Sequence, residues 1–220
     1  MKPWETLAVA TAPDGSRFEL QRHDTNYVIL ADGYDLMTSF AHGSEDAMMS
    51  LACPRPKADA CVLVGGLGMG YTLAATLELL PARGSVVVSE LIPEVVDWNR
   101  GPLGPLAGHP LDDPRTELVV GDVVDVIRES KSRFDAILLD VDNGVDSFTL
   151  DSNSRLYSPK GLAAARRSLR PGGALAIWSV GTERTFERTF HEAGFVASTH
   201  RLRGRGKRDG HYSVLVGRKG

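Results

Sequence analysis

Five short apolar segments alternate with helix-like stretches in the middle of the chain, and this alternation sets the fold class. The apolar segments are rich in β-branched residues, which is typical of strands buried on both faces of a sheet. Helix candidates start near Gly70, Pro93, Val123 and Pro159, and another is expected near residues 182–193. Such alternation predicts a parallel sheet with right-handed crossovers and helices on both faces. The expected strands span residues 61–66, 85–90, 116–122, 134–140 and 174–180.

The two ends of the chain differ from this middle. Residues 1–41 have the pattern of two strand pairs around turns, one at Asp32-Gly33, and we expect a small β-extension there. After the fifth strand and its helix, FVASTHRLRG and HYSVLVGRK have the pattern of an antiparallel hairpin. The predicted fold is therefore α/β: a Rossmann-like parallel sheet with a terminal hairpin and an N-terminal β-extension. We expect residues 42–220 to form the ligand-binding domain.

The composition narrows the functional classes. Hydrophobic residues make up 42% and charged residues 24%, which is ordinary for a globular protein, and the net charge of −3 gives no reason to expect nucleic acid or an anionic membrane. No apolar run approaches the roughly 20 residues of a membrane span, and we expect no signal peptide. The two cysteines fit a reducing cytoplasm. Since no His, Cys and Asp residues have ligand spacing, we expect no metal.

A glycine-rich turn joins the first strand to its helix. The turn reads Gly66-x-Gly68-x-Gly70, followed by Tyr71. A phosphate-binding P-loop would need Lys and Ser or Thr there, and a dinucleotide fingerprint would need a small residue at Tyr71. The spacing present is the one found in S-adenosylmethionine-dependent enzymes. A tight turn without a ligand is the alternative interpretation.

Carboxylates follow three successive strands of the expected sheet. Glu90, Asp122 and Asp140 stand at these strand ends, and Asp142 and Asn143 come just after the last. Ligands of open parallel sheets bind at the carboxyl ends of the strands. One carboxylate can accept from both ribose hydroxyls of an adenosine, and another can accept from the adenine amino group. Each acid alone could simply cap a helix, but together, after a glycine turn, they indicate a cofactor site.

These motifs resemble the spermidine synthase-like branch of the class I methyltransferase fold. The resemblance runs from about Leu30 to the C-terminus. It is carried by VLVGGLGMG, SELIPEVVDWNRGPLG, GDVVDVI, FDAILLDVDNG and LYSPKGLAAARRSLRPGGALAIW. The resemblance implies S-adenosylmethionine or its decarboxylated form as cofactor, and it makes the β-extension a candidate homodimer interface.

The resemblance also implies roles for individual residues. The glycine loop would lie beneath the methionine-derived part of the cofactor, Glu90 would hold the ribose hydroxyls, and Asp122 would accept from the adenine amino group. Asp140 would be the acid at the reaction centre, with Asp142 or Asn143 positioning the acceptor. The implied cofactor-binding set is Gly66, Leu67, Gly68, Gly70, Glu90, Leu91, Asp122, Val123 and Asp140.

The sequence departs from the family where the family binds its diamine. Aminopropyltransferases carry D-S-S-D-P or a near variant after the fourth strand, whereas this chain has Asp140-Val141-Asp142-Asn143-Gly144. Their loop often reads G-G-G-D-G, but Leu67 and Met69 leave this loop without an acid for the aminopropyl amine. The Tyr-His pair expected on the first helix is absent as well. The resemblance is therefore closer at the residues that would bind the cofactor than at those that would bind the diamine.

Two enzymatic hypotheses and two others follow. The leading one is methyl transfer from S-adenosylmethionine to a small polar or amine acceptor, which Leu67 and Met69 favour. The alternative is aminopropyl transfer from decarboxylated S-adenosylmethionine to an amine, which Asp140 and the overall similarity favour. A non-catalytic relative would be expected to lack the strand-end acids, which are present. Nucleic acid is not expected, because the basic loop of residues 201–208 has no interleaved aromatic residues and has the composition of a solvated hairpin tip.

Overall fold

The described residues of this computed structural model form two β-sheets, with helices around the larger one. The structure describes residues 3–40, 45–139, 155–179, 184–203 and 211–220. The smaller sheet contains β1 (Glu5–Thr11), β2 (Arg17–His23), β3 (Asn26–Ala31) and β4 (Tyr34–Thr38). The strands of the larger sheet are β5 (Cys61–Gly65), β6 (Ser85–Glu90), β7 (Thr116–Val120), β8 (Phe134–Leu139), β9 (Leu169–Ser179), β10 (Phe195–Arg203) and β11 (His211–Lys219). The α-helices are α1 (Glu45–Ala52), α2 (Tyr71–Leu79), α3 (Pro93–Arg100), α4 (Val123–Glu129), α6 (Pro159–Ser168) and α7 (Arg184–Glu192).

The larger sheet has the strand order β10-β11-β9-β8-β5-β6-β7. Strands β5 to β9 pair in parallel, whereas β11 pairs antiparallel with both β9 and β10. The predicted Rossmann-like sheet and its terminal hairpin are therefore confirmed. The chain moves outward from β5 through β6 to β7 and then returns to β8 on the other side of β5. This reversal next to β5 is the place where open α/β sheets bind ligands.

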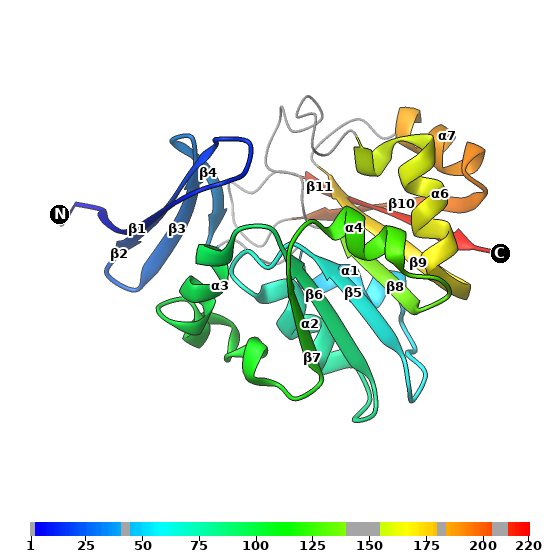
Figure 1. The fold of residues 1–220 in the computed structure, drawn as a ribbon, viewed down its shortest axis with the longest axis horizontal. Helices are drawn as coiled ribbons and strands as arrows, with labels where there is room; N and C mark the ends of the chain where they lie inside the picture. The colour runs from blue at the N-terminus through cyan, green and yellow to red at the C-terminus, as the bar shows by residue number, and fades with distance from the viewer. Residues whose placement is uncertain (1–2, 41–44, 140–154, 180–183, 204–210) are drawn as a thin grey trace.

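Alternating side chains of the parallel strands pack into two hydrophobic cores, one on each face of the sheet. Val62 and Val64 join the core that contains side chains of α1, α2 and α3, while Leu63 joins the core with α4, α6 and α7. Figure 1 shows α4, α6 and α7 gathered over one face. Both faces of the central strands are thereby covered, which explains their nearly continuous apolar sequence.

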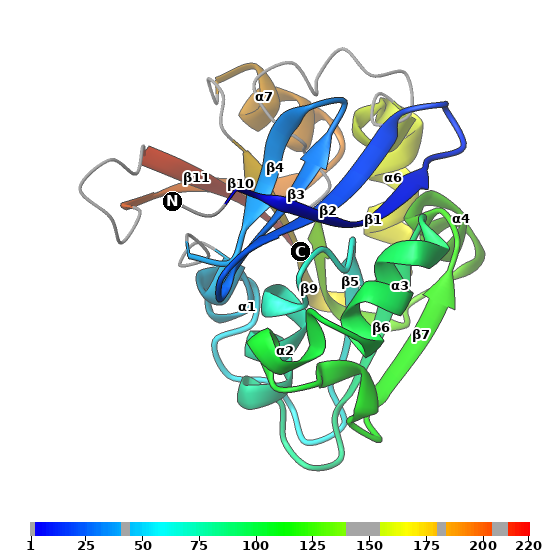
Figure 2. The same cartoon turned by 90° about the vertical axis from the view of Figure 1, so that its left-hand side faces the viewer.

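The N-terminal residues form the predicted β-extension as an antiparallel meander in the order β1-β2-β3-β4. Its buried residues Leu20 and Ile29 belong to the same core as α1, α2 and α3, so the small sheet packs against the larger unit. Figure 2 looks onto this sheet and shows it crossing in front of the larger unit. The domain boundary near residue 41 stays a prediction, and residues 41–44 lie outside the described ranges.

The structure differs from the sequence-based expectations in three places. Strand β7 is the edge of its sheet, and Val120 is 52% exposed, so this strand is not buried on both faces. Strand β9 begins at Leu169 rather than at residue 174, because the Pro-Gly-Gly segment continues the strand with a register shift. The segment from Arg100 to Arg115, for which the sequence predicts no helix or strand, contains the short 3-10 helices η1 (Gly104–Ala107) and η2 (Pro110–Asp112).

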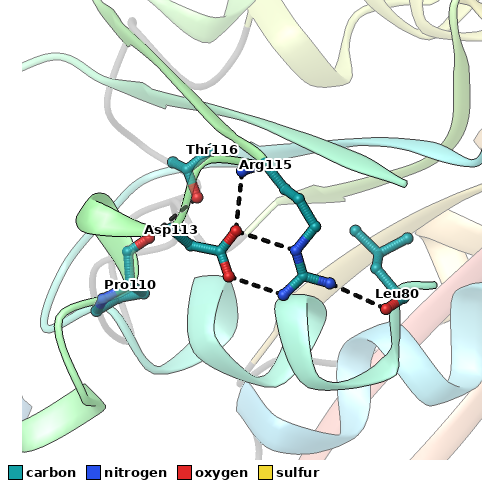
Figure 3. A network of polar contacts seen from close by, with 5 residues as sticks. All are labelled: Leu80, Pro110, Asp113, Arg115 and Thr116. Atoms are coloured by element: carbon teal, nitrogen blue, oxygen red, sulfur yellow. Dashed lines mark hydrogen bonds and ion pairs between the residues drawn. The ribbon is translucent and has the colours of Figure 1, made fainter. Parts of the chain in front are cut away.

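A polar network fixes the end of this segment just before β7. Arg115 makes two hydrogen bonds through its Nε and Nη2 to the Asp113 carboxylate (3.0 and 2.8 Å) and donates through Nη1 to the Leu80 carbonyl (3.0 Å) (Figure 3). The Thr116 hydroxyl donates to the Pro110 carbonyl. The network ties the end of α2 to the start of β7.

Candidate ligand site at the glycine loop

The glycine loop between β5 and α2 requires its glycines for backbone reasons. Gly66, Gly68 and Gly70 have φ angles of 87°, 53° and 84°, a region that residues with a Cβ rarely adopt. At Gly70 a Cβ would also lie 3.0 Å from the Oδ1 of Asn99 and 3.2 Å from Pro110. The loop is therefore both left-handed and closely packed, as expected where the backbone must bend below a ligand.

Glu90 lies at the end of β6 and accepts a hydrogen bond from the backbone of the glycine loop. Its Oε2 accepts from the Leu67 amide (2.8 Å) and its Oε1 from the Ile92 amide (2.9 Å), and the residue is only 7% exposed. Burial raises the pKa of this carboxyl, while the surrounding backbone amides pull its pKa back down. No ion pair with Glu90 is found among the described residues. Each carboxylate oxygen keeps a further lone pair, so ribose hydroxyls could still donate to it.

The loop amides are largely engaged by the protein itself. Gly66 donates to the Ser89 carbonyl (2.9 Å) and Gly70 to the Leu67 carbonyl (2.8 Å). Leu67 donates to Glu90, and the Gly68 amide also helps to lower the pKa of Glu90. The amide of Met69 donates to the sulfur of Met37 at 3.2 Å. Among these amides, only that of Met69 is held by a weak acceptor.

Two residues at this loop were missed by the sequence analysis. Asn99 of α3 is 2% exposed and donates through Nδ2 to the Gly68 carbonyl (2.7 Å) and the Val95 carbonyl (2.9 Å). Its Oδ1 is buried without a hydrogen-bond partner among the described residues. Met37 reaches the loop from β4 of the small sheet. Neither has a sequence signal of its own, because each acts through a contact between distant segments.

The strand ends beside the loop carry the predicted adenosine-binding residues. The Gly121 amide donates to the Glu90 carbonyl (2.8 Å), which places the ends of β6 and β7 side by side. Asp122 caps α4 by accepting from the Val124 amide (2.8 Å), so its simpler structural role is present. Val123 is buried at 9% exposed, whereas Leu91 is 43% exposed at the end of β6. Adenine binding by these residues stays a prediction.

The predicted catalytic residues Asp140, Asp142 and Asn143 lie outside the described residues. The described part of β8 ends at Leu139, which is paired with Gly65 directly before the glycine loop. The strand that precedes these residues is thus next to the loop. Their roles stay predictions.

The described residues fit the adenosine end of an adenosyl cofactor better than the end that carries the sulfur substituent. Glu90 offers a buried carboxylate to the ribose, and Leu91 offers exposed apolar surface next to it. At the other end, the amides of Gly66, Leu67, Met69 and Gly70 already donate hydrogen bonds within the protein. The donor set therefore suits an adenosine whose sulfur substituent carries no carboxylate.

Comparisons with known proteins found similar sequences and similar solved structures. No family model matches the chain. A polyamine aminopropyltransferase from Nitrosomonas europaea is 36% identical over 115 residues, which are 52% of this chain and 34% of that protein. One from Mycobacterium tuberculosis is 35% identical over 116 residues, which are 50% of this chain and 21% of that protein. The matches thus span about a third or less of these relatives.

Solved structures show the same architecture. Spermidine synthase from Thermotoga maritima superposes with a TM-score of 0.74 at 19% identity, over 98% of this chain and 73% of that one. A spermidine synthase in complex with the transition state analogue AdoDATO gives a TM-score of 0.73, again at 19% identity, over 98% of this chain and 72% of that one. The chain therefore has the Rossmann-like fold of the spermidine synthases, and its predicted resemblance to the spermidine synthase-like family is confirmed.

The structure also bears on membrane association. Within the described ranges, no helix has the length and apolar character needed to cross a membrane.

Proposed function

We propose that this chain transfers an aminopropyl group from decarboxylated S-adenosylmethionine to a small amine. Methyl transfer is the leading hypothesis from the sequence. The reported relatives are named polyamine aminopropyltransferase or spermidine synthase, and these names favour aminopropyl transfer, the alternative hypothesis. The observation that carries the proposal is the engagement of the glycine-loop amides by Ser89, Glu90, Leu67 and Met37.

The cofactor carboxylate is the group that separates the two chemistries. S-adenosylmethionine carries it and its decarboxylated form does not. A buried carboxylate needs hydrogen-bond donors or a cation, because leaving a charged group unpaired costs several kcal/mol, roughly. In the described loop the amides of Gly66, Leu67, Met69 and Gly70 already donate within the protein, and the apolar side chains of Leu67 and Met69 are buried. Leu67 and Met69 are the residues that favour methyl transfer in the sequence, but their amides donate to Glu90 and Met37 and are not open to a carboxylate.

We assign each residue of the site a role in binding the cofactor, orienting the amine or taking its proton. The cofactor supplies a carbon bonded to a sulfonium, which an amine nitrogen attacks in line. Glu90 would hold the ribose and Asp122 the adenine amino group. Asp140 would orient the amine and take its proton, directly or through water, as the nitrogen–carbon bond forms and the carbon–sulfur bond breaks. Asp142 or Asn143 would position the acceptor. A cytoplasmic homodimer belongs to the same proposal.

Methyl transfer remains a second candidate because of one feature. The loop has Met69, whose side chain is fully buried, where aminopropyltransferases often carry an acid for the free amine. A site without that acid holds an aminopropyl amine less firmly. The acids after β8 would then have to supply the missing charge.

The experiment that tests the proposal is a product assay. The purified chain is incubated with either cofactor and a panel of diamines, and the products are identified by mass spectrometry. We expect diamines to gain the mass of an aminopropyl group with decarboxylated S-adenosylmethionine only, and we expect Asp140→Asn to abolish most turnover while binding persists. Methylated products with S-adenosylmethionine, and none with the decarboxylated form, would overturn the proposal.

A further inference from the structure

The thioether of Met37 lies directly on the glycine loop. Its Sδ is 2.9 Å and its Cε 2.8 Å from the position that a Cβ on Gly68 would take. The same Sδ accepts the hydrogen bond from the Met69 amide at 3.2 Å. Met37 thus fills the space beside Gly68 and also accepts from the neighbouring Met69 amide.

Met37 comes from the small sheet, whereas the loop belongs to the large one. Met37 is paired with Ile29 inside the meander and packs against the core shared by both sheets. The Tyr71 hydroxyl adds a second link, since it donates to the Ser39 carbonyl one residue beyond β4 (3.3 Å). The small sheet therefore holds this side chain over the loop.

The chemistry of a thioether suits one cofactor better than the other. Methionine is apolar, polarisable and flexible, so it can lie against a propyl chain. It offers no proton to a carboxylate, and its sulfur is only a weak acceptor. A carboxylate could reach the Met69 amide only after the whole Met37 side chain had left its place between the sheets.

We propose that Met37 is a specificity-determining residue that excludes the carboxylate of S-adenosylmethionine from the glycine loop. This inference rests on the proposed function for its biological meaning. Its physical content is separate: Met37 fills the space where the carboxylate would bind, whichever cofactor the wild-type protein prefers.

Calorimetry on four proteins tests the inference. The affinities of S-adenosylmethionine and its decarboxylated form are measured for the wild type, Met37→Ala, Met37→Leu and Leu36→Ala. Leu36 is the matched control, because it neighbours Met37 on β4 and packs against the same core. We expect Met37→Ala to shift the affinity ratio toward S-adenosylmethionine by about tenfold or more. Met37→Leu keeps the bulk and Leu36→Ala keeps the thioether, so both should retain the wild-type ratio.

Several outcomes would overturn the inference. They are an unchanged ratio in Met37→Ala, an equal shift in Leu36→Ala, or a shift in Met37→Leu as large as in Met37→Ala. A wild type that prefers S-adenosylmethionine contradicts the proposed function alone, since the shift in Met37→Ala can still be measured. A wild type that binds neither cofactor overturns both.

A second readout follows the wild type itself and uses a variant only to assign one signal. The chain has five methionines, so labelling their methyl groups with ¹³C gives a spectrum in which Met37→Leu assigns the Met37 signal by its loss. We expect this signal to shift when decarboxylated S-adenosylmethionine saturates the wild type. An unmoved Met37 signal at saturation would place the cofactor away from the thioether and overturn the inference.

Discussion

At the residue scale, Glu90 combines two demands that oppose each other. It is buried, which favours the protonated acid, yet it accepts from the amides of Leu67 and Ile92, which favours the carboxylate. Burial prevails, and the pKa of Glu90 is raised above its ordinary value of 4.5. A ribose would require the ionised form, since hydroxyls donate to a carboxylate most strongly when it is charged.

The raised pKa of Glu90 predicts a pH-dependent contribution to folding. A group whose pKa is raised in the folded state contributes stability that is fully present below its unfolded pKa and is lost as pH rises through the folded pKa. We therefore expect the free energy of unfolding of the wild type, minus that of Glu90→Gln, to be largest below about 4.5 and to fall as pH rises. Urea denaturation from pH 4 to pH 8 measures this difference. A difference that grows with pH would contradict the assigned direction.

Gly70 permits a second prediction with a matched control. Gly70→Ala should cost about 1–2 kcal/mol for the left-handed backbone, and more for the approach of Asn99. Gly108 has a φ of 70° with nothing within 4 Å of its Cβ position, so Gly108→Ala should cost only the backbone share. Denaturant unfolding compares the two. Equal losses would show that packing around Gly70 adds nothing.

At the scale of elements, the Arg115 network tests what holds the edge strand β7. Arg115→Ala removes the two bonds to Asp113 and the bond to the Leu80 carbonyl, and we expect a loss of about 1–3 kcal/mol. Hydrogen exchange should rise in β7 and at the end of α2, with cofactor affinity unchanged. The control is Arg133→Ala, whose pair with Glu117 is more exposed and should contribute about 0–1 kcal/mol. Loss of cofactor binding in Arg115→Ala would show that this edge and the glycine loop are coupled.

The elements themselves were largely predictable from the sequence, and the reasons are local. Apolar β-branched runs gave β5, β6 and β8, prolines marked the starts of α3 and α6, and the glycine spacing marked the loop. The exposure of β7 was not predictable, since it depends on the strand order of the finished sheet. The strand start at Leu169 was not predictable, because Pro171 and the two glycines after it are residues that usually end a strand. Met37 and Asn99 were missed because their partners are 31 or 32 residues away along the chain.

At the scale of the whole molecule, the small sheet is part of the candidate site and not only an appendage. It shares the hydrophobic core of α1, α2 and α3, and it carries Met37 to the glycine loop. A homodimer through this sheet was expected from the sequence. Light scattering at micromolar concentration tests it: we expect twice the chain mass of 23.8 kDa, and a mass equal to one chain would contradict the expectation.

The proposed function requires that the glycine loop bind a cofactor without a carboxylate. The most direct test is calorimetry of the wild-type chain with S-adenosylmethionine and decarboxylated S-adenosylmethionine, side by side at one pH and ionic strength. We expect the decarboxylated form to bind more tightly by at least about 100-fold, near 2.7 kcal/mol. Equal affinities, or tighter binding of S-adenosylmethionine, would contradict it.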